Sequence, residues 1–395
     1  MTTTTTPLPG SRAHTDGGWG RADAPAAPIQ TRSERPWSFD PAHFGAPTGR
    51  EVNWKHTPID RLGGVLTPGE ASSAVRVDTG AAAGYVVSGA DVRGEFFRPE
   101  DLPAAIAWQR DGAGLHVRIP AGEELTDPLR IDLVGERADG FGAAHIVLEA
   151  QPNSRATVIL YHSGSAQYAQ NVEILVRDGA ALTVIAVQRW DDDAVHAATH
   201  QARVDRDAKL THVVVTLGGA VVRVNPSVEL SGPGAEGRLF GLSFADAGQH
   251  FESQVYLHHK GPHTVGDVLY KGALQGVGAR SVWIGDVLIG RDAVGTDSYE
   301  ANRNLVLTDG ARADSIPNLE IETGEIVGAG HASATGRFDD EQLFYLQARG
   351  IDEEEARRLV VLGFLSEIVQ RIGVPDLETE LTAAIERELL EGAAL

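Results

Sequence analysis

From about residue 74, the apolar residues of this chain come in short β-branched runs separated by polar turns. Each run spans three to eight residues and is bounded by Gly, Asp, Asn or Pro, a pattern typical of β-strands. Examples are GYVVSG, LRIDLVG, ATVILYH, VEILVRDG and LTHVVVTLGG. Because no helix-length amphipathic segment separates these runs, a sheet wound through alternating strands and helices is not expected.

The polar turns recur along the chain at a nearly constant spacing. When Ala156, Leu182, Leu210 and Leu239 are taken as equivalent positions, the steps between them are 26, 28 and 29 residues. A repeat of this length indicates a solenoid or a propeller. Since the strands lack a strict alternation of apolar and polar residues, the pattern favours a parallel β-solenoid whose walls pack inward and stack coil on coil. A β-sandwich or jelly roll is the competing fold.

The pattern divides the chain into four parts. Residues 1–35 are rich in Thr, Gly, Pro and Ala, cannot bury enough surface to offset their ordering entropy, and are predicted to be disordered. Residues 36–73 place aromatic residues among Pro and Gly and are predicted to form a small N-terminal helical or cap region. The mainly β solenoid core is expected over residues 74–336, and a C-terminal α-helical domain over residues 337–395.

The C-terminal domain is predicted to contain three helices. The first ends at Gly350, and Asp352 begins a capping-box pattern for the second. Pro375 is expected to help stop the second helix, and the third runs from Asp376 to about Leu390. A helical tail of this kind closes the exposed end of a solenoid or offers a partner a docking face.

Composition limits the classes of function. The chain carries a formal net charge of −21, from 55 acidic and 34 basic residues, and has no block of Lys and Arg, so we expect no nucleic-acid partner and no anionic-membrane partner. Without cysteine, the chain cannot form a disulfide or supply a thiolate to a metal. No apolar run approaches the roughly 20 residues of a membrane span, and the start MTTTTTPLPG does not resemble a signal peptide. We therefore expect a soluble, cytoplasmic protein.

One histidine lies where the strand pattern ends. His331 is surrounded only by small residues, which leave its imidazole without bulky cover. A neutral imidazole binds iron well, but a chain without cysteine would need a partner's thiolates to complete such a site. The alternative is a hydrogen-bonded structural histidine at the end of the last coil.

Two other groups of histidines are weaker candidates. His196 and His200 have the i, i+4 spacing of a helical zinc site, but the glutamate of H-E-x-x-H is missing and the context predicts a strand. His258, His259 and His263 lie around a Gly-Pro turn, where turn geometry and strand-surface positions explain them. The role of both groups is left open.

Enzyme signatures are weak in this sequence. It contains no G-x-S-x-G elbow, P-loop or Rossmann glycine fingerprint. A pair of carboxylates for glycoside chemistry is left open, because solenoid enzymes assemble such pairs from separate coils. A polysaccharide-active β-solenoid enzyme and a homodimeric structural scaffold without a ligand role are therefore the alternative functions.

The stretch from about Leu230 to Phe364 carries a series of motifs in a fixed order. They read GQHFESQV, HHKGPHTVGDVLYKGAL, SVWIGDVLIG, TDSYEANRNLVLTDGARADSIPNLEI and GHASATGRFDDEQLFYLQARGI. Together they resemble the SufB/SufD family of iron–sulfur cluster assembly scaffolds, and SufD more closely. The resemblance is collinear over about a third of the chain, and its specificity lies in the combination of the motifs.

The resemblance implies a right-handed parallel β-helix core flanked by helical parts, in a non-catalytic scaffold subunit. It implies a heterodimer with a SufB-like paralogue and a SufC-like ABC ATPase that docks on the helical tail and hydrolyses ATP. By motif, His331 corresponds to the family's histidine for cluster assembly at the SufB–SufD interface. The iron–sulfur cluster would be transient and shared with the partner, so we expect none to be stably bound by this chain alone. A homodimer of the isolated chain is left open.

Two positions depart from the family pattern. The cysteine that many relatives carry two residues before the histidine is Ala329 here, so a cysteine cannot be required at that position. The SufB-type cysteine falls at Ala311, which argues for SufD rather than SufB.

Apolar residues of the tail form the predicted docking surface for the ATPase. They are Leu343, Phe344, Leu359, Leu362, Phe364 and Ile368. An apolar face left over on a helical hairpin usually marks a partner site. Deleting the residues from about 352 onward is expected to remove ATPase binding and to leave the β body folded.

Overall fold

The computed structural model describes residues 35–67, 74–80, 82–89, 92–111, 114–338 and 340–393. The predicted disordered segment, residues 1–35, lies outside the described residues except for Arg35.

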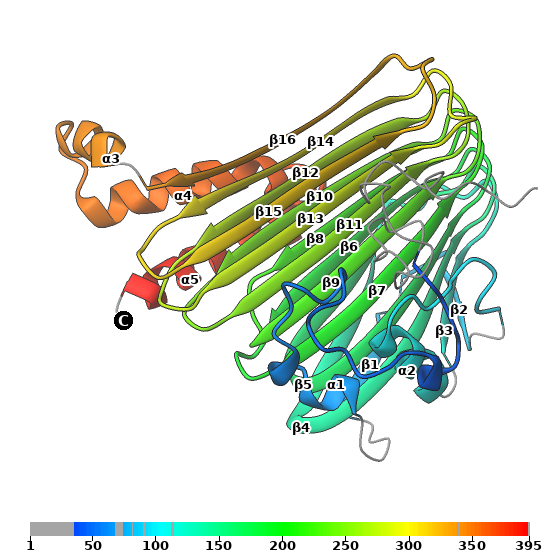
Figure 1. Cartoon of the computed structure of the whole chain (residues 1–395), viewed down its shortest axis with the longest axis horizontal. Coiled ribbons are helices and arrows are strands. Elements are labelled where there is room, and N and C mark those ends of the chain that lie inside the picture. Colours follow the sequence, from blue (N-terminus) through cyan, green and yellow to red (C-terminus); the bar gives the residue numbers. More distant parts are fainter. Residues whose placement is uncertain are drawn as a thin grey trace, which may run out of the picture.

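Two stacked walls of parallel strands form the body of the molecule (Figure 1). Each coil contributes one strand to each wall, so strands that are neighbours within a wall are two apart in the sequence. We call the walls odd and even after their strand numbers. The predicted parallel β-solenoid is confirmed, and an antiparallel sandwich is excluded because the stacked strands from β4 to β16 pair in parallel. The right-handed winding stays a prediction.

The strands form where the apolar runs predict them, but most are longer than the runs of three to eight residues, and β4 and β5 each join two of those runs. The odd wall contains β7 (Val195–Val204), β9 (Val221–Leu230), β11 (His250–His259), β13 (Arg280–Ile289) and β15 (Arg312–Ile321). The even wall contains β6 (Ala181–Trp190), β8 (Lys209–Thr216), β10 (Glu236–Ala245), β12 (Val265–Leu274), β14 (Asp297–Val306) and β16 (Gly328–Arg337). The long strands β4 (Leu129–Ala150) and β5 (Arg155–Val176) run through both walls, and β1 (Val75–Thr79), β2 (Val86–Ser88) and β3 (Leu115–Ile119) complete this end of the sheet.

The stacking of the coils corrects the repeat expected from the sequence. Two of the three predicted steps match the observed strand pairing. In the third, Leu210 pairs with Gly237, and Leu239 pairs with His212 instead. A side chain at Gly237 would crowd Leu230 of the opposite wall, so the stacking position holds a glycine. An alignment by apolar residues therefore slips by two positions at this coil.

The N-terminal segment lies against the outer face of the odd wall. It contains η2 (Pro41–His43), η3 (Ile59–Arg61) and α1 (Gly63–Leu66), and α2 (Leu102–Arg110) packs nearby on β4 and β5. Trp54, Leu62 and Val65 form an apolar contact with Val195 and Val221. The segment predicted as a cap thus covers a side wall of the solenoid, where it shields apolar strand residues from water.

A buried ion network fastens this segment to the wall. The Arg223 guanidinium lies 2.7 Å from Asp101 Oδ2 and 3.2 Å from Glu252 Oε1, and it stacks over the Trp54 ring. Thr57 donates a hydrogen bond to the same Glu252 carboxylate. Despite the cost of burial, the Arg223 and His250 side chains hold the pKa of Glu252 down at about 2. Arg223, Asp101 and Glu252 are all buried, and the cost of burying each charge is offset by the opposite charge beside it.

We expect Arg223→Ala to lower the free energy of unfolding by about 3–5 kcal/mol, because Asp101 and Glu252 would remain buried without their cation. Urea unfolding followed by circular dichroism measures the change. Arg206→Ala is the matched control, since Arg206 pairs with Asp178 on the surface, where an ion pair contributes about 1 kcal/mol or less. Equal effects of the two substitutions would show that the buried network does not hold the N-terminal segment.

Three helices follow the last strand, as predicted: α3 (Asp340–Gln347), α4 (Glu353–Val369) and α5 (Pro375–Ala393). The Asp352 side chain caps α4 by accepting a hydrogen bond from the Glu355 backbone N–H at 2.9 Å. Pro375 begins α5, a position that tolerates proline because its N–H would have no helical partner. Helices α4 and α5 lie along the outer face of the even wall (Figure 1). Within the described residues, none of the helices is long and apolar enough to cross a membrane.

Candidate functional site at the open end of the solenoid

The last coil leaves two strand edges without a neighbour. Among the described strands, β16 pairs only with β14, and β15 pairs only with β13. In Figure 1, β15 and β16 are the last strands of the two walls, at the end of the stack opposite β4. We call this end of the stack the open end. Unpaired backbone N–H and C=O groups along such an edge are a template for pairing with another chain.

His331 lies on β16 and points into the last coil. On this strand Ala329 packs against the interior core and Ala332 packs against the outer helix–wall cluster, so odd-numbered positions face inward. The Ser333 hydroxyl confirms this direction, because it lies 2.9 Å from the Ser315 hydroxyl of the opposite wall. His331 is nevertheless exposed, since no further coil stacks on it. The imidazole is therefore an interior side chain that is accessible only from the open end.

A buried carboxylic acid lies one coil below the histidine. Glu300 on β14 is the pairing partner of His331 on β16, and its side chain has no exposed surface. Neither carboxylate oxygen has a hydrogen-bond partner in the described chain. Burial, with a smaller contribution from the Asp286 charge, raises the pKa of Glu300 to about 8. No motif in the sequence marks this residue as part of a site.

Further polar side chains continue along the same inner face. Asn304 Nδ2 donates to the side-chain oxygen Oδ1 of Asn302 at 2.7 Å, and Asn302 Nδ2 donates to the backbone oxygen of Tyr270 at 3.2 Å. The signal in the sequence is a polar residue at every second position of β14, namely Ser298, Glu300, Asn302 and Asn304. A period of two shows that these residues share a face, but it cannot tell that the face is the inner one.

The i, i+4 histidine pair lies inside the solenoid on strand β7. His196 Nδ1 is 2.8 Å from the Gln188 side-chain oxygen, and His200 Nδ1 is 2.9 Å from His212 Nε2. Burial lowers the pKa of His196 and His200 well below the usual value. These imidazoles are neutral interior side chains that bond to one another and to amides. Their spacing reflects alternate inward positions on a strand.

The second histidine group separates in space. His259 points inward and contacts the hydroxyls of Thr264 and Ser298 at 2.8 and 2.9 Å. His258 points outward on the same strand, and His263 occupies a turn with φ of 58°. Across the described residues, no three His, Asp or Glu side chains come together as a metal site would require. Neither histidine group therefore forms a metal centre within this chain.

The predicted docking residues of the tail differ in accessibility. Phe344 is 71% exposed and Leu359 is 41% exposed, and Leu343 is partly buried. Leu362 and Phe364 are partly buried against the helix–wall cluster, and Ile368 is completely buried in it. Ile368 can therefore meet a partner only if α4 leaves the wall. The docking role stays a prediction that now depends mainly on Phe344 and Leu359.

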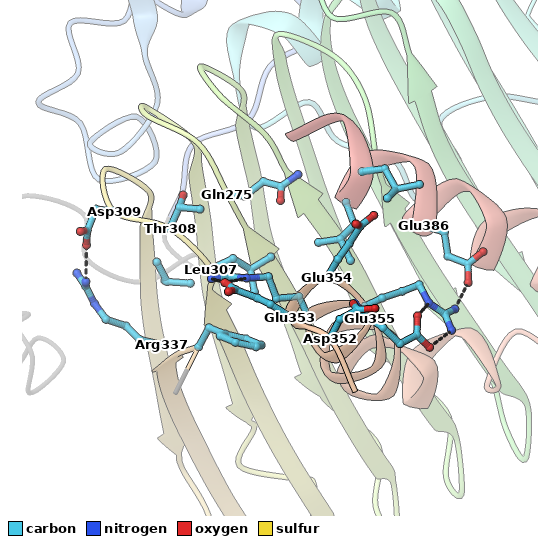
Figure 2. Close-up of a pocket in the computed structure, with 16 residues that line it drawn as sticks. Gln275, Leu307, Thr308, Asp309, Arg337, Asp352, Glu353, Glu354, Glu355 and Glu386 are labelled. Atoms are coloured by element: carbon cyan, nitrogen blue, oxygen red, sulfur yellow. Dashed lines mark hydrogen bonds and ion pairs between the residues drawn. The ribbon is translucent and has the colours of Figure 1, made fainter. Parts of the chain in front are cut away.

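A groove of about 1120 Å³ runs between the last even-wall strands and the tail (Figure 2). Arg358 bridges Glu355 and Glu386 at 2.7 and 2.6 Å and so ties α4 to α5. On the strand side Arg337 pairs with Asp309 at 2.7 Å. These ion pairs are at least a third exposed, so each contributes little to stability, and none of the three joins the tail to the strands across the groove.

These features define a class of protein: a parallel β-solenoid with a helical tail on one wall and an inward histidine at its open end. Residues 133–364 match the family model for the SUF system FeS cluster assembly, SufBD core domain. The chain is 47% identical over 363 residues to the iron-sulfur cluster assembly SufBD family protein Rv1462 of Mycobacterium tuberculosis H37Rv, which covers 89% of this chain and 91% of that protein. This chain belongs to the SufBD family of iron–sulfur cluster assembly proteins.

Mycobacterium leprae has two proteins of this family that resemble the chain to different degrees. The SufBD family protein ML0594 is 47% identical over 363 residues, covering 89% of this chain and 93% of that protein. The SufBD family protein ML0593 is 29% identical over 237 residues, covering 60% of this chain and 27% of that protein. One organism therefore carries two distinct members, of which this chain resembles one along nearly its whole length.

Proposed function

We propose that this chain is a SufD-like scaffold subunit that pairs with a SufB-like paralogue and presents His331 to an iron–sulfur cluster at their interface. The observation that carries the proposal is the position of His331. It is an inward-facing, exposed imidazole on β16, a strand that pairs with β14 on one side and has no described partner on the other.

A paralogue is the partner that fits this end best. A chain with the same fold has the same kind of free parallel edge, so two open ends can continue each other's walls through backbone hydrogen bonds. The presence of two family members in one organism supports a heterodimer of unlike subunits. A homodimer through the same edge is the alternative for the isolated chain.

The cluster is cargo of the complex in this proposal. Iron–sulfur clusters are held mainly by thiolates with occasional histidine, and this chain has no cysteine. His331 is a suitable nitrogen donor for iron, and the thiolates would come from the partner. The subunit itself would be non-catalytic. A SufC-like ATPase would dock at Phe344 and Leu359 and act through the tail on the last coil, which borders the groove of Figure 2 together with α4 and α5.

His331→Ala in the co-expressed complex is expected to leave assembly unchanged and to reduce the cluster content markedly. The substitution should change the free energy of unfolding by less than about 1 kcal/mol, because the exposed imidazole packs against little. The complex is isolated anaerobically, its size is measured by gel filtration, and its cluster by visible absorption and by iron and sulfide content.

His43→Ala is the matched control, since it removes another exposed histidine, on the far N-terminal segment. A variant complex with the usual cluster load would show that His331 is a structural histidine. Turnover of a glycan by the pure chain would favour the alternative of a polysaccharide-active enzyme instead.

A further inference from the structure

Glu300 is a buried carboxylic acid that the fold does not use for its own stability. Both of its oxygens are enclosed and neither accepts or donates a hydrogen bond within the described chain. A buried polar group without a partner destabilises a protein, so such a residue needs another explanation. Ion-pair networks elsewhere in this chain, such as the one around Arg223, show the compensation that Glu300 lacks.

The neighbouring residues leave room for this side chain. On the opposite wall, Gly285 has no side chain, and a β-carbon there would lie 2.4 Å from Glu300 Oε2. The Trp283 ring borders the same space, since that β-carbon would lie 2.3 Å from it. The Trp283 indole N–H is also buried without a partner. The last coil, with His331 at the paired position, covers Glu300 towards the open end.

We propose that Glu300 and His331 together form an iron(II)-binding pair at the open end, with Glu300 as the second ligand from this chain. The inference deepens the proposed function and rests on it for the identity of the metal. Paired residues on neighbouring strands are about 4.8 Å apart, and both side chains project to the inner face. Their donor atoms can therefore meet at one ion.

The chemistry of the two donors suits iron(II). Imidazole nitrogen and carboxylate oxygen are the donors of many non-haem iron(II) sites, which keep further positions open for other ligands. No hydrogen bond holds the Glu300 carboxylate in place, so binding to an ion breaks no existing hydrogen bond. The unfilled positions on the ion would be left for donors from the partner across the open end.

Metal-catalysed oxidation tests this pairing without measuring cluster assembly. The full chain is exposed to iron(II), ascorbate and oxygen, and oxidised peptides are located by mass spectrometry. We expect oxidation at His331, which belongs to the pair, and at Trp283, which lies close to it. This oxidation should require added iron. Glu300→Gln and His331→Ala should each reduce oxidation at Trp283 about tenfold, and the double variant should be no lower than either single one.

Two further variants separate a ligand from a structural residue. Glu300→Met, which fills the same space without a carboxyl group, should raise the midpoint of thermal unfolding, because it removes an unsatisfied buried group. Asn302→Leu is the matched control: it removes an inward side chain of the same strand that is hydrogen-bonded, so it should lower that midpoint and leave local oxidation unchanged.

The outcomes distinguish this inference from the proposed function. Unchanged oxidation in Glu300→Gln, absence of local oxidation in the wild-type chain, or a lower unfolding midpoint in Glu300→Met would each overturn the role of Glu300. One result would support the proposed function and exclude Glu300 as a ligand: normal oxidation in Glu300→Gln, together with loss of both oxidation and cluster content in His331→Ala. The opposite result would support the iron-binding pair and exclude the proposed role of His331 in cluster assembly: loss of oxidation in both single variants, with normal cluster content in His331→Ala.

Discussion

A chain that ends at Ile351 is expected to aggregate. Helices α4 and α5 cover apolar side chains on the outer face of the even wall, including Val213, Val215 and Phe240, which are almost completely buried. Each large apolar side chain that becomes exposed loses about 1.5–3 kcal/mol of stabilisation. Polar contacts are lost as well, such as that of Lys271 Nζ with the Phe364 backbone oxygen at 2.8 Å.

Gel filtration and binding of an apolar dye to the truncated chain check this prediction. A monomeric chain with native circular dichroism and no dye binding would contradict it. The result bears on the expectation from the sequence that the β body stays folded without the tail. The structure argues against that expectation, because Leu362, Phe364 and Ile368 of α4 pack on the chain's own wall.

Point variants are therefore the better test of ATPase docking. Phe344→Glu and Leu359→Glu place charges on exposed positions of α3 and α4 and should weaken co-purification of the ATPase without affecting folding. Val87→Glu is the matched control, since Val87 is as exposed as Leu359, at 41%, but lies among the first strands. Undiminished co-purification of the ATPase with both tail variants would place docking elsewhere.

Lowering the pH from 7 to 5 is expected to destabilise the folded chain by several kcal/mol. Burial lowers the pKa of His162 and His212 to about 4 and that of His259 to about 3. In the unfolded chain these imidazoles would titrate near the ordinary value of about 6.5. At pH 5 the unfolded chain therefore binds protons that the folded interior does not, which favours unfolding by about 2 kcal/mol for each such histidine.

The direction of this effect follows from the lowered values. The contribution of these histidines to stability is complete above about pH 6.5 and is lost as the pH falls towards 4. Denaturant midpoints between pH 7.5 and 4.5 measure the change. His212→Gln retains a polar side chain at the contact with His200 but does not titrate, so it should remove about one proton from the uptake on unfolding. Midpoints that stay constant across this range would contradict the prediction.

The local parts of the fold could be predicted from the sequence because their causes lie within a few residues. Short β-branched runs between polar turns define strands, and Asp352 in front of three acidic residues defines the start of α4. The position of His331 where strands give way to helices is also visible in the sequence. The motifs around it indicated the family, which the comparisons with known proteins confirm.

What only the tertiary structure decided depends on residues far apart in the chain. Glu300 and His331 are 31 positions apart and become neighbours through the stacking of two coils, which alternation within one strand cannot show. The polar face of β14 is its inner face, which the sequence of that strand cannot show, because the direction of a face depends on the wall opposite it. The apolar stripe of α4 likewise has the same pattern whether it meets a partner or a wall of its own chain. The sequence alone therefore determined the strands, the helices and the family, and the stacking of the coils decided which side chains share a site, because burial depends on what packs against a face.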